Sequence, residues 1–458
     1  MSEQFKEQGG AATMAPKPLR RWLTSMLLTR LISERRLINQ RAKTERNRIS
    51  SGKAHVVEYF HQVDDAYSHL AAQVLKPLLS CYNIQLVYHL VSGPEGDNSV
   101  EPDLLSSLAR YDSACVAAGY GLKFPRDANP PRKSLLTRAS QILAAQDSGA
   151  FTDCAADVGR ALWENDDAAM LELSQRQGSA SIPALAMRIK EGNARRAELK
   201  HYSGGMFYYG GEWYWGVDRL YHLEQRLRGL RIIKQGGKGV LIPRPEIDAT
   251  GDFPNAKSLT LEIYPSLRSP YTAVGFDLAV KLAEDTGVNL VVRPVLPMVM
   301  RGVPATREKG MYIFADAARE ARTLGVPFGD FYDPIGEPIR RCYSLYPWAC
   351  EQGKGNHLIS AFLNAAFAQG INTNTKKGLK SVVEKAGLDW NAAKENLDKP
   401  GWQGLVEGNR LAMYQAGLWG VPSFRLLDAS GEQLFALWGQ DRLWLIAREI
   451  RRHSGGDC

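Results

Sequence analysis

The sequence lacks the cysteine and histidine spacings that would indicate a metal centre or a dithiol site. It has six cysteines and eight histidines in 458 residues, with no CxxC, HxxxH or HExxH pattern among them. A disulfide framework and a bound metal are therefore not expected. Scattered single cysteines in a long chain are typical of a reducing compartment, which predicts a cytoplasmic protein.

Long apolar runs are also absent. No segment approaches the ~20 apolar residues that a membrane span requires. Residues 20–32 come nearest to a signal peptide, but polar side chains such as Thr24 and Arg30 interrupt them, and a charged segment follows in place of a cleavage site. We predict a packed helix here. A basic helix of this kind could instead lie on an acidic membrane surface, an alternative that we do not favour.

Positive charge is in excess only at the start of the chain. Residues 1–53 carry twelve Lys and Arg against four Asp and Glu, an excess equal to the +8 of the whole chain. The rest of the sequence is therefore neutral. A basic surface over a folded domain, which nucleic-acid binding requires, is not expected.

Two parts of the sequence repeat the same order of elements. In each, a β-rich run and helix formers are followed by a second β-rich run, a long helical stretch, two strands around a glycine turn, and a terminal helix. Phe60 aligns with Tyr264 and Tyr67 with Tyr271. The corresponding segments are 55–60 and 259–264, 83–88 and 288–293, 100–200 and 305–415, 205–215 and 422–437, and 216–220 and 439–443.

This order predicts an α/β fold made of two tandem thioredoxin-like domains, each with a helical insertion. The linker between them is expected from its glycines and prolines, which include Gly236 and Gly237. The expected divisions are a basic helical tail over 1–53, a first domain over 54–230, the linker over 231–257 and a second domain over 258–458.

Five short motifs follow one another in the second copy. They are Ser269-Pro-Tyr271, the stretch from Pro304 to Lys309-Gly-Met-Tyr312 with Asp316, Leu324-Gly-Val-Pro-Phe328, Gly417-Leu-Trp-Gly-Val-Pro-Ser-Phe424 and Gly439-Gln-Asp-Arg-Leu443. With them, the second copy resembles the 2-hydroxychromene-2-carboxylate isomerase and kappa-class glutathione transferase branch of the DsbA-like thioredoxin superfamily. The first copy resembles the superfamily as a whole.

The resemblance implies a site for reduced glutathione. Ser269 would bind the glutathione sulfur, in place of the redox cysteine of the disulfide oxidoreductases. The residues agree with this role, because a helix N-terminus stabilises a thiolate and a serine hydroxyl can donate to it. Val421-Pro422 matches the family's cis-proline, whose preceding backbone pairs with the cysteinyl part of glutathione.

Three more positions carry implied ligand contacts. Lys309 matches a lysine that reaches the bound peptide, and Gln440 and Asp441 match the residues that hold its γ-glutamyl end. One departure stands out, because the family's asparagine is missing from the loop at residues 300–304.

The first copy departs further from this pattern. Asp65 stands where Ser269 stands, and a carboxylate there would repel a thiolate. Met206 takes the place expected for the cis-proline, while Asp218 and Arg219 are retained. We predict a scaffolding or substrate-wall role for this copy, without glutathione chemistry.

The leading hypothesis is a glutathione-dependent isomerase or transferase that acts on a small aromatic or conjugated electrophile, with Ser269 as its catalytic residue. One alternative is a DsbA-type thiol–disulfide oxidoreductase, which would need Cys342 or Cys350 as its reactive thiol. The other is a non-catalytic binding protein that has kept only the fold.

Overall fold

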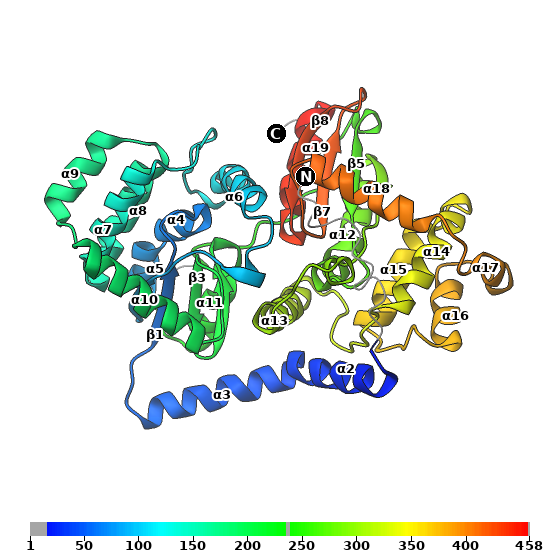
Figure 1. The fold of residues 1–458 in the computed structure, drawn as a ribbon, viewed down its shortest axis with the longest axis horizontal. Coiled ribbons are helices and arrows are strands. Elements are labelled where there is room, and N and C mark those ends of the chain that lie inside the picture. Colours follow the sequence, from blue (N-terminus) through cyan, green and yellow to red (C-terminus); the bar gives the residue numbers. More distant parts are fainter. Residues whose placement is uncertain (1–15, 235–238, 457–458) are drawn as a thin grey trace. The chain divides into compact units, whose positions relative to one another are not determined.

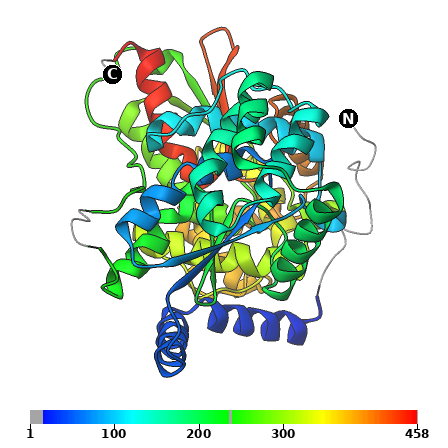
Figure 2. The same cartoon turned by 90° about the vertical axis from the view of Figure 1, so that its left-hand side faces the viewer.

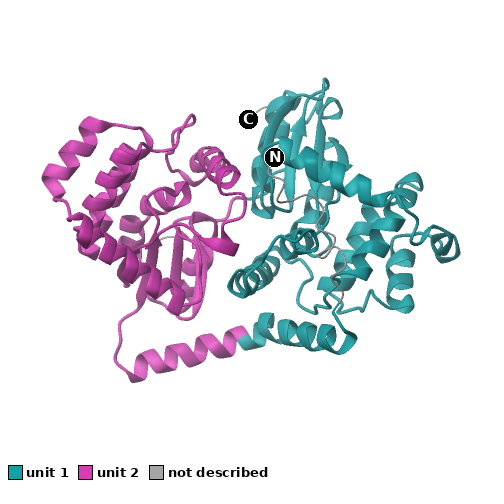
Figure 3. Ribbon diagram, in the orientation of Figure 1, with its two compact units in different colours: residues 1–36, 246–458 teal, residues 37–245 magenta. Residues whose placement is uncertain are grey.

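The computed structural model describes residues 16–234 and 239–456, so residues 1–15, the linker glycines Gly236 and Gly237, and Cys458 lie outside the described part. The chain divides into two compact units (Figure 3). Unit 1 comprises residues 1–36 and 246–458, and unit 2 comprises residues 37–245. Each unit contains one four-stranded sheet. The finer boundaries expected at residues 54, 231 and 258 stay predictions.

The sheet of unit 1 has the strand order β6-β5-β7-β8, with β5 and β6 parallel and the other pairs antiparallel. Helix α12 forms the crossover from β5 to β6, and α19 follows β8 and contacts both α12 and β7 (Figure 1). This β-α-β unit, followed by a hairpin and a helix, is the predicted thioredoxin plan. The bounds are β5 (Thr260–Tyr264), α12 (Pro270–Thr286), β6 (Asn289–Val292), β7 (Ser423–Leu427), β8 (Gln433–Trp438) and α19 (Leu443–Ser454).

A helical insertion separates β6 from β7, as the sequence predicts. Its first long helix packs on α12 through a small apolar core of Val274, Ala317 and Ala321, with Tyr271 and Phe328 against it. The insertion comprises α13 (Arg307–Leu324), α14 (Glu337–Glu351), α15 (Gly355–Phe367), α16 (Lys376–Lys385), α17 (Trp390–Asn396) and α18 (Trp402–Gln415), preceded by the short η6 (Met298–Arg301).

Unit 2 repeats this plan, with the strand order β2-β1-β3-β4 and the same pattern of parallel and antiparallel pairs. Its strands are β1 (Val56–His61), β2 (Gln85–Leu90), β3 (Met206–Tyr209) and β4 (Glu212–Trp215). Its helices are α4 (Ala66–Ala72) and α5 (Leu75–Cys81), the insertion helices α6 (Pro102–Ala117), α7 (Lys133–Ala144), α8 (Ser148–Trp163), α9 (Asp167–Gln177) and α10 (Ile182–Glu198), and the terminal α11 (Leu220–Gly229).

Side-chain contacts confirm the alignment of the two copies. Tyr271 donates its hydroxyl to Asp316 at 2.9 Å, and Tyr67 donates to Asp112 at 2.8 Å, with 45 residues between donor and acceptor in both. The tyrosine lies in the first turn of the helix that follows the first strand of the sheet, α12 or α4, and the aspartate lies on the first long insertion helix. A tyrosine hydroxyl therefore joins the two corresponding helices in each unit.

The strand register corrects one sequence prediction. Met206 pairs with Phe60 on β1, just as Ser423 pairs with Tyr264 on β5, so Met206 corresponds to Ser423. Gly205 is the true counterpart of Pro422, because its carbonyl accepts from Gly216 as that of Pro422 accepts from Gly439. The sequence prediction for Met206 is therefore wrong by one residue, because sequence similarity is weak there and only the strand pairing sets the register.

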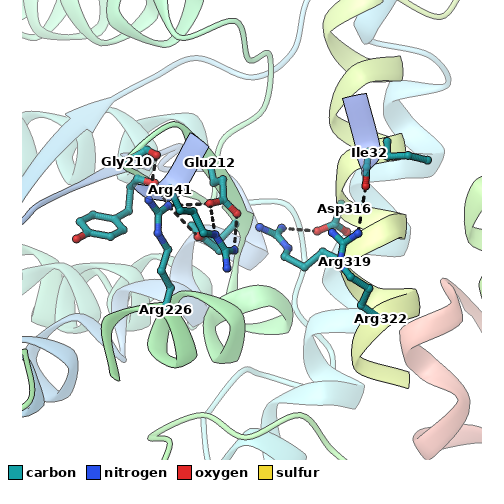
Figure 4. A network of polar contacts seen from close by, with 10 residues as sticks. Ile32, Arg41, Gly210, Glu212, Arg226, Asp316, Arg319 and Arg322 are labelled. Carbon is teal, nitrogen blue, oxygen red and sulfur yellow. Dashed lines mark hydrogen bonds and ion pairs between the residues drawn. The ribbon is translucent and has the colours of Figure 1, made fainter. Parts of the chain in front are cut away.

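The basic N-terminal segment is helical, as predicted, over α2 (Pro18–Ile32) and α3 (Glu34–Ser50). Helix α2 lies beside α13 at the edge of unit 1 (Figures 1 and 2). Arg322 of α13 donates to the carbonyl of Ile32 at the end of α2 (Figure 4). None of the described helices is long and apolar enough to cross a membrane.

The later part of α3 is tied to the hairpin of unit 2. Arg41 donates to both carboxylate oxygens of Glu212 at 2.7 Å, and Arg226 pairs with the same carboxylate at 2.9 Å while also donating to the carbonyl of Gly210 (Figure 4). Basic residues of the segment therefore make specific ion pairs within a folded unit. They do not form an unstructured charged tail over residues 37–50.

Candidate functional site

Ser269 begins α12 at the end of the short loop that follows β5. Its backbone N–H donates to the carbonyl of Ser266, and its Oγ accepts from the N–H of Thr272 at 3.1 Å. Pro270 occupies the first helical position, where a missing N–H costs nothing. The predicted helix start is therefore confirmed, and the serine caps it. The hydroxyl also donates to the carbonyl oxygen of Val421 at 3.2 Å.

The bond between Val421 and Pro422 is cis, as the resemblance implied. This loop is held from both sides. The carbonyl of Pro422 accepts from Gly439 at 2.9 Å, and Gly420 lies against Trp438 so closely that a Cβ would be 2.2 Å from the indole ring. The cis-proline loop is therefore fixed between the start of α12 and the end of β8.

Gln440 and Asp441 lie in the one-turn helix η7 (Gln440–Arg442), which opens α19. The side chain of Gln440 is buried and donates to Glu320 of α13 at 2.9 Å. Asp441 is half-buried, with its carboxylate 3.5 Å from Arg442, and it folds back toward Gly439. The N–H of Gly439 donates to the carbonyl of Pro422. The Asp441 carboxylate therefore lies beside the residue that binds the cis-proline loop.

Lys309 approaches the same loop from α13. Its ammonium lies 5.5 Å from the centre of the Trp419 ring, a cation–π distance, and burial lowers the pKa of Lys309. The Trp419 ring in turn lies 5.5 Å from that of Trp438. The indole N–H of Trp419 is buried and has no hydrogen-bond partner among the described residues.

No sequence signal indicates that Trp419 and Trp438 lie at the site. Trp419 lies inside a motif that carries the resemblance, but nothing in the sequence indicates that it stacks beside Lys309. Together the structure groups a hydroxyl and an ammonium around one loop. Both can donate to an anion.

An ion pair with a buried carboxylate supports the loop that carries Ser269. Arg268 donates to both carboxylate oxygens of Asp333, at 2.9 and 3.0 Å, and Asp333 is 5% exposed. Arg21 of α2 donates to the Asp333 carbonyl at 2.6 Å, and Ser25 accepts from its N–H at 3.0 Å. Helix α2 is therefore connected, through Asp333, to the residue that precedes Ser269. No sequence signal predicts this link across 312 residues.

The cysteines considered for disulfide chemistry lie elsewhere. Cys342 and Cys350 are both on α14, and neither is in the loop between β5 and α12. Burial raises the pKa of the Cys342 thiol far above its usual range, and it also raises that of Cys350. A thiol must ionise to attack, so neither side chain has the properties of a redox cysteine.

Asp65 of unit 2 caps α4 at the place that corresponds to Ser269. Its carboxylate accepts from the N–H of Ser68 at 2.8 Å and from the Ser68 hydroxyl at 2.7 Å, and burial raises the pKa of Asp65 to about 6. The folded chain then holds this proton more tightly than the unfolded chain does between about pH 4 and 6. The contribution of Asp65 to the free energy of unfolding therefore falls as the pH rises through this window.

We expect Asp65→Asn, which keeps the helix cap, to remove the loss of stability that Asp65 causes as the pH rises from about 4 to 6. The check is the melting temperature of the wild type and the variant, measured from pH 4 to 7. Asp147→Asn, at an exposed cap of α8 in the same unit, is the matched control. Identical changes in the two variants would contradict the prediction.

Comparison with known proteins covers the same part of the chain. Residues 260–451 match the family model of the DSBA-like thioredoxin domain. A 2-hydroxychromene-2-carboxylate isomerase of Sphingobium xenophagum is 29% identical over 196 residues, which cover 40% of this chain and 94% of the relative. One of Pseudomonas putida is 22% identical over 202 residues, covering 42% of this chain and 95% of the relative.

Solved structures are similar to a comparable share of this chain. A 2-hydroxychromene-2-carboxylate isomerase covers 43% of this chain and 98% of its own, with 22% identity and a TM-score of 0.35. A probable DsbA oxidoreductase of Streptomyces coelicolor covers 44% and 92%, with 20% identity and a TM-score of 0.34. The C-terminal half of this chain, over residues 260–451, is a DsbA-like thioredoxin domain.

Proposed function

We propose that unit 1 is a glutathione-dependent isomerase or transferase for a small aromatic or conjugated electrophile, similar in activity to the 2-hydroxychromene-2-carboxylate isomerases. One observation carries the proposal: the Ser269 hydroxyl caps α12 and lies 3.2 Å from the carbonyl of Val421, beside the cis-proline. A serine replaces a redox cysteine at this helix start, which favours binding of an external thiol over disulfide exchange. The scattered cysteines support a cytoplasmic location.

The residues of unit 1 fit reduced glutathione. Its sulfur would lie at the start of α12, where the helix dipole and the Ser269 hydroxyl both stabilise negative charge. The hydroxyl would turn from the Val421 carbonyl to the sulfur, which frees that carbonyl for the cysteinyl N–H of the peptide. Bound glutathione would supply a nucleophilic thiolate to the electrophile.

The charged ends of the peptide would bind side chains of opposite charge. Lys309, which lies beside the Trp419 ring, would hold a carboxylate. The half-buried carboxylate of Asp441 would hold the γ-glutamyl ammonium. Gln440 would contribute by fixing η7 against α13, since its amide already binds Glu320.

Reduced glutathione is expected to raise the melting temperature of the wild type, because a ligand that binds only the folded state stabilises it. The gain is about 2.7 kcal/mol at a hundredfold excess over Kd. Asp441→Ala should lose most of this shift. Thermal unfolding at increasing glutathione concentration measures both.

Asp218→Ala is the matched control, since Asp218 occupies the place of Asp441 in unit 2. It should keep the full shift. The absence of any shift in the wild type would contradict glutathione binding and favour a non-catalytic binding protein. Insulin reduction that is lost in Cys342→Ser would instead favour an oxidoreductase.

A further inference from the structure

Helix α2 leaves five apolar side chains exposed or half-buried along one face, although Ile32 at its end is buried in unit 1. Leu19 is 68% exposed and Leu27 60%, and Trp22 and Leu23 are also exposed, with Met26 half-buried between them. These five residues recur at helical spacing and form what we call the outward face of α2. Exposed single leucines are ordinary in proteins, but a contiguous apolar stripe along one helix marks an interaction surface.

Polar side chains hold the opposite side of α2 against the domain. Arg21 and Ser25 are buried and bind the backbone of Asp333, and Thr29 both donates to and accepts from the backbone of Phe331. A surface helix usually buries its apolar side, whereas α2 buries Ile32 but leaves the five residues of its outward face toward solvent. The polar bonds fix the orientation of the helix, so the outward face is displayed by a rigid element.

Positive charge surrounds the outward face. Lys17, Arg20 and Arg30 are all exposed, and residues 16–33 contain no Asp or Glu. Arg20 lies at one edge of the stripe, and Arg30 lies at its C-terminal end. Long basic side chains at such places can extend to phosphate groups while their stems cover apolar surface.

We propose that the outward face of α2 binds the surface of an anionic lipid bilayer, an alternative that the sequence alone did not favour and that the exposed stripe now supports. The helix would lie in the plane of the interface, with Leu19, Leu23 and Leu27 in the boundary between headgroups and acyl chains, and Trp22 at headgroup level. Lys17, Arg20 and Arg30 would contact the lipid phosphates. The protein would thus be a peripheral membrane protein, whatever the activity of the site in unit 1.

A second copy of the chain fits this face less well than a bilayer does. The helix has 15 residues and is therefore about 22 Å long and about 10 Å wide, which gives roughly 200 Å² of contact. A stable dimer needs about 800 Å² from each partner. Pairing two such faces would also bring like charges together with no acidic residue on the helix to balance them.

The test is co-sedimentation of the full chain with vesicles of phosphatidylcholine, with and without phosphatidylglycerol. We expect binding to the anionic vesicles, weaker binding to the neutral ones, and a decrease with added salt. The double variant Leu23→Ser with Leu27→Ser should have a vesicle partition coefficient lower by about tenfold or more, because both side chains leave the apolar layer. Both residues are exposed, so their replacement leaves the polar attachment of α2 intact.

Leu405→Ser, which alters a 40% exposed leucine on α18 of the same unit, is the matched control and should bind like the wild type. Equal binding of the double variant, equal binding to neutral vesicles, or no binding at all would overturn the proposal. Analytical ultracentrifugation tests whether the outward face instead binds a second copy of the chain. A wild-type dimer that the double variant dissociates would assign the outward face to a second copy and overturn lipid binding.

Discussion

Turnover of a glutathione-dependent substrate is expected to fall about 10²- to 10³-fold when Ser269 is replaced with alanine. The hydroxyl is the side-chain donor that the structure places at the start of α12, where it now contacts Val421 and Thr272. Without it, the thiolate of the proposed site would keep only the helix dipole, and its pKa would rise. The thiolate absorbance of bound glutathione, titrated against pH, should shift to higher pH in the variant, together with the loss of kcat.

The same substitution also removes a helix cap, which costs about 1 kcal/mol of stability. Two variants separate this effect from catalysis. Ser269→Thr keeps a hydroxyl and should retain most of the activity. Ser181→Ala removes a serine cap from α10 in unit 2 and should leave turnover unchanged. An unaltered rate and pH profile in Ser269→Ala would refute the proposed role of the hydroxyl.

Replacing Asp333 with asparagine is expected to lower the free energy of unfolding by about 3–5 kcal/mol, because it leaves the Arg268 guanidinium in a protein interior without its counter-charge. The loop before Ser269 should lose its anchor as well. Urea unfolding followed by circular dichroism gives the stability. Asp285→Asn, which breaks an exposed pair with Lys281, is the control and should change little.

The pH dependence provides a second readout for Asp333. Burial by itself would raise the pKa of this carboxyl, but the ion pair and hydrogen bonds with Arg268 outweigh burial, so its pKa lies below the usual range. A lowered pKa adds stability that is present above about pH 4 and is lost as the pH falls through the folded-state value. The difference in the free energy of unfolding between the wild type and Asp333→Asn should therefore shrink in acid. A constant difference down to low pH would contradict the role of the ion pair.

The sequence by itself determined the fold plan. Strand and helix periods, glycine turns and the twofold repeat depend on local patterns, and these predicted the two sheets, their insertions and the helix start at Ser269. The cis bond before Pro422 came from a short motif that the resemblance supplied. Such features could be predicted because neighbouring residues alone specify them.

Only the tertiary structure decided which distant side chains meet. The strand register moved the counterpart of Pro422 from Met206 to Gly205, and the fold brought Lys309 over Trp419. It also placed Arg21 against Asp333, with the apolar side of α2 facing outward. A helical pattern gives the faces of a helix but not the partner of each face. That choice depends on hydrogen bonds and packing between segments hundreds of residues apart, which no local pattern records.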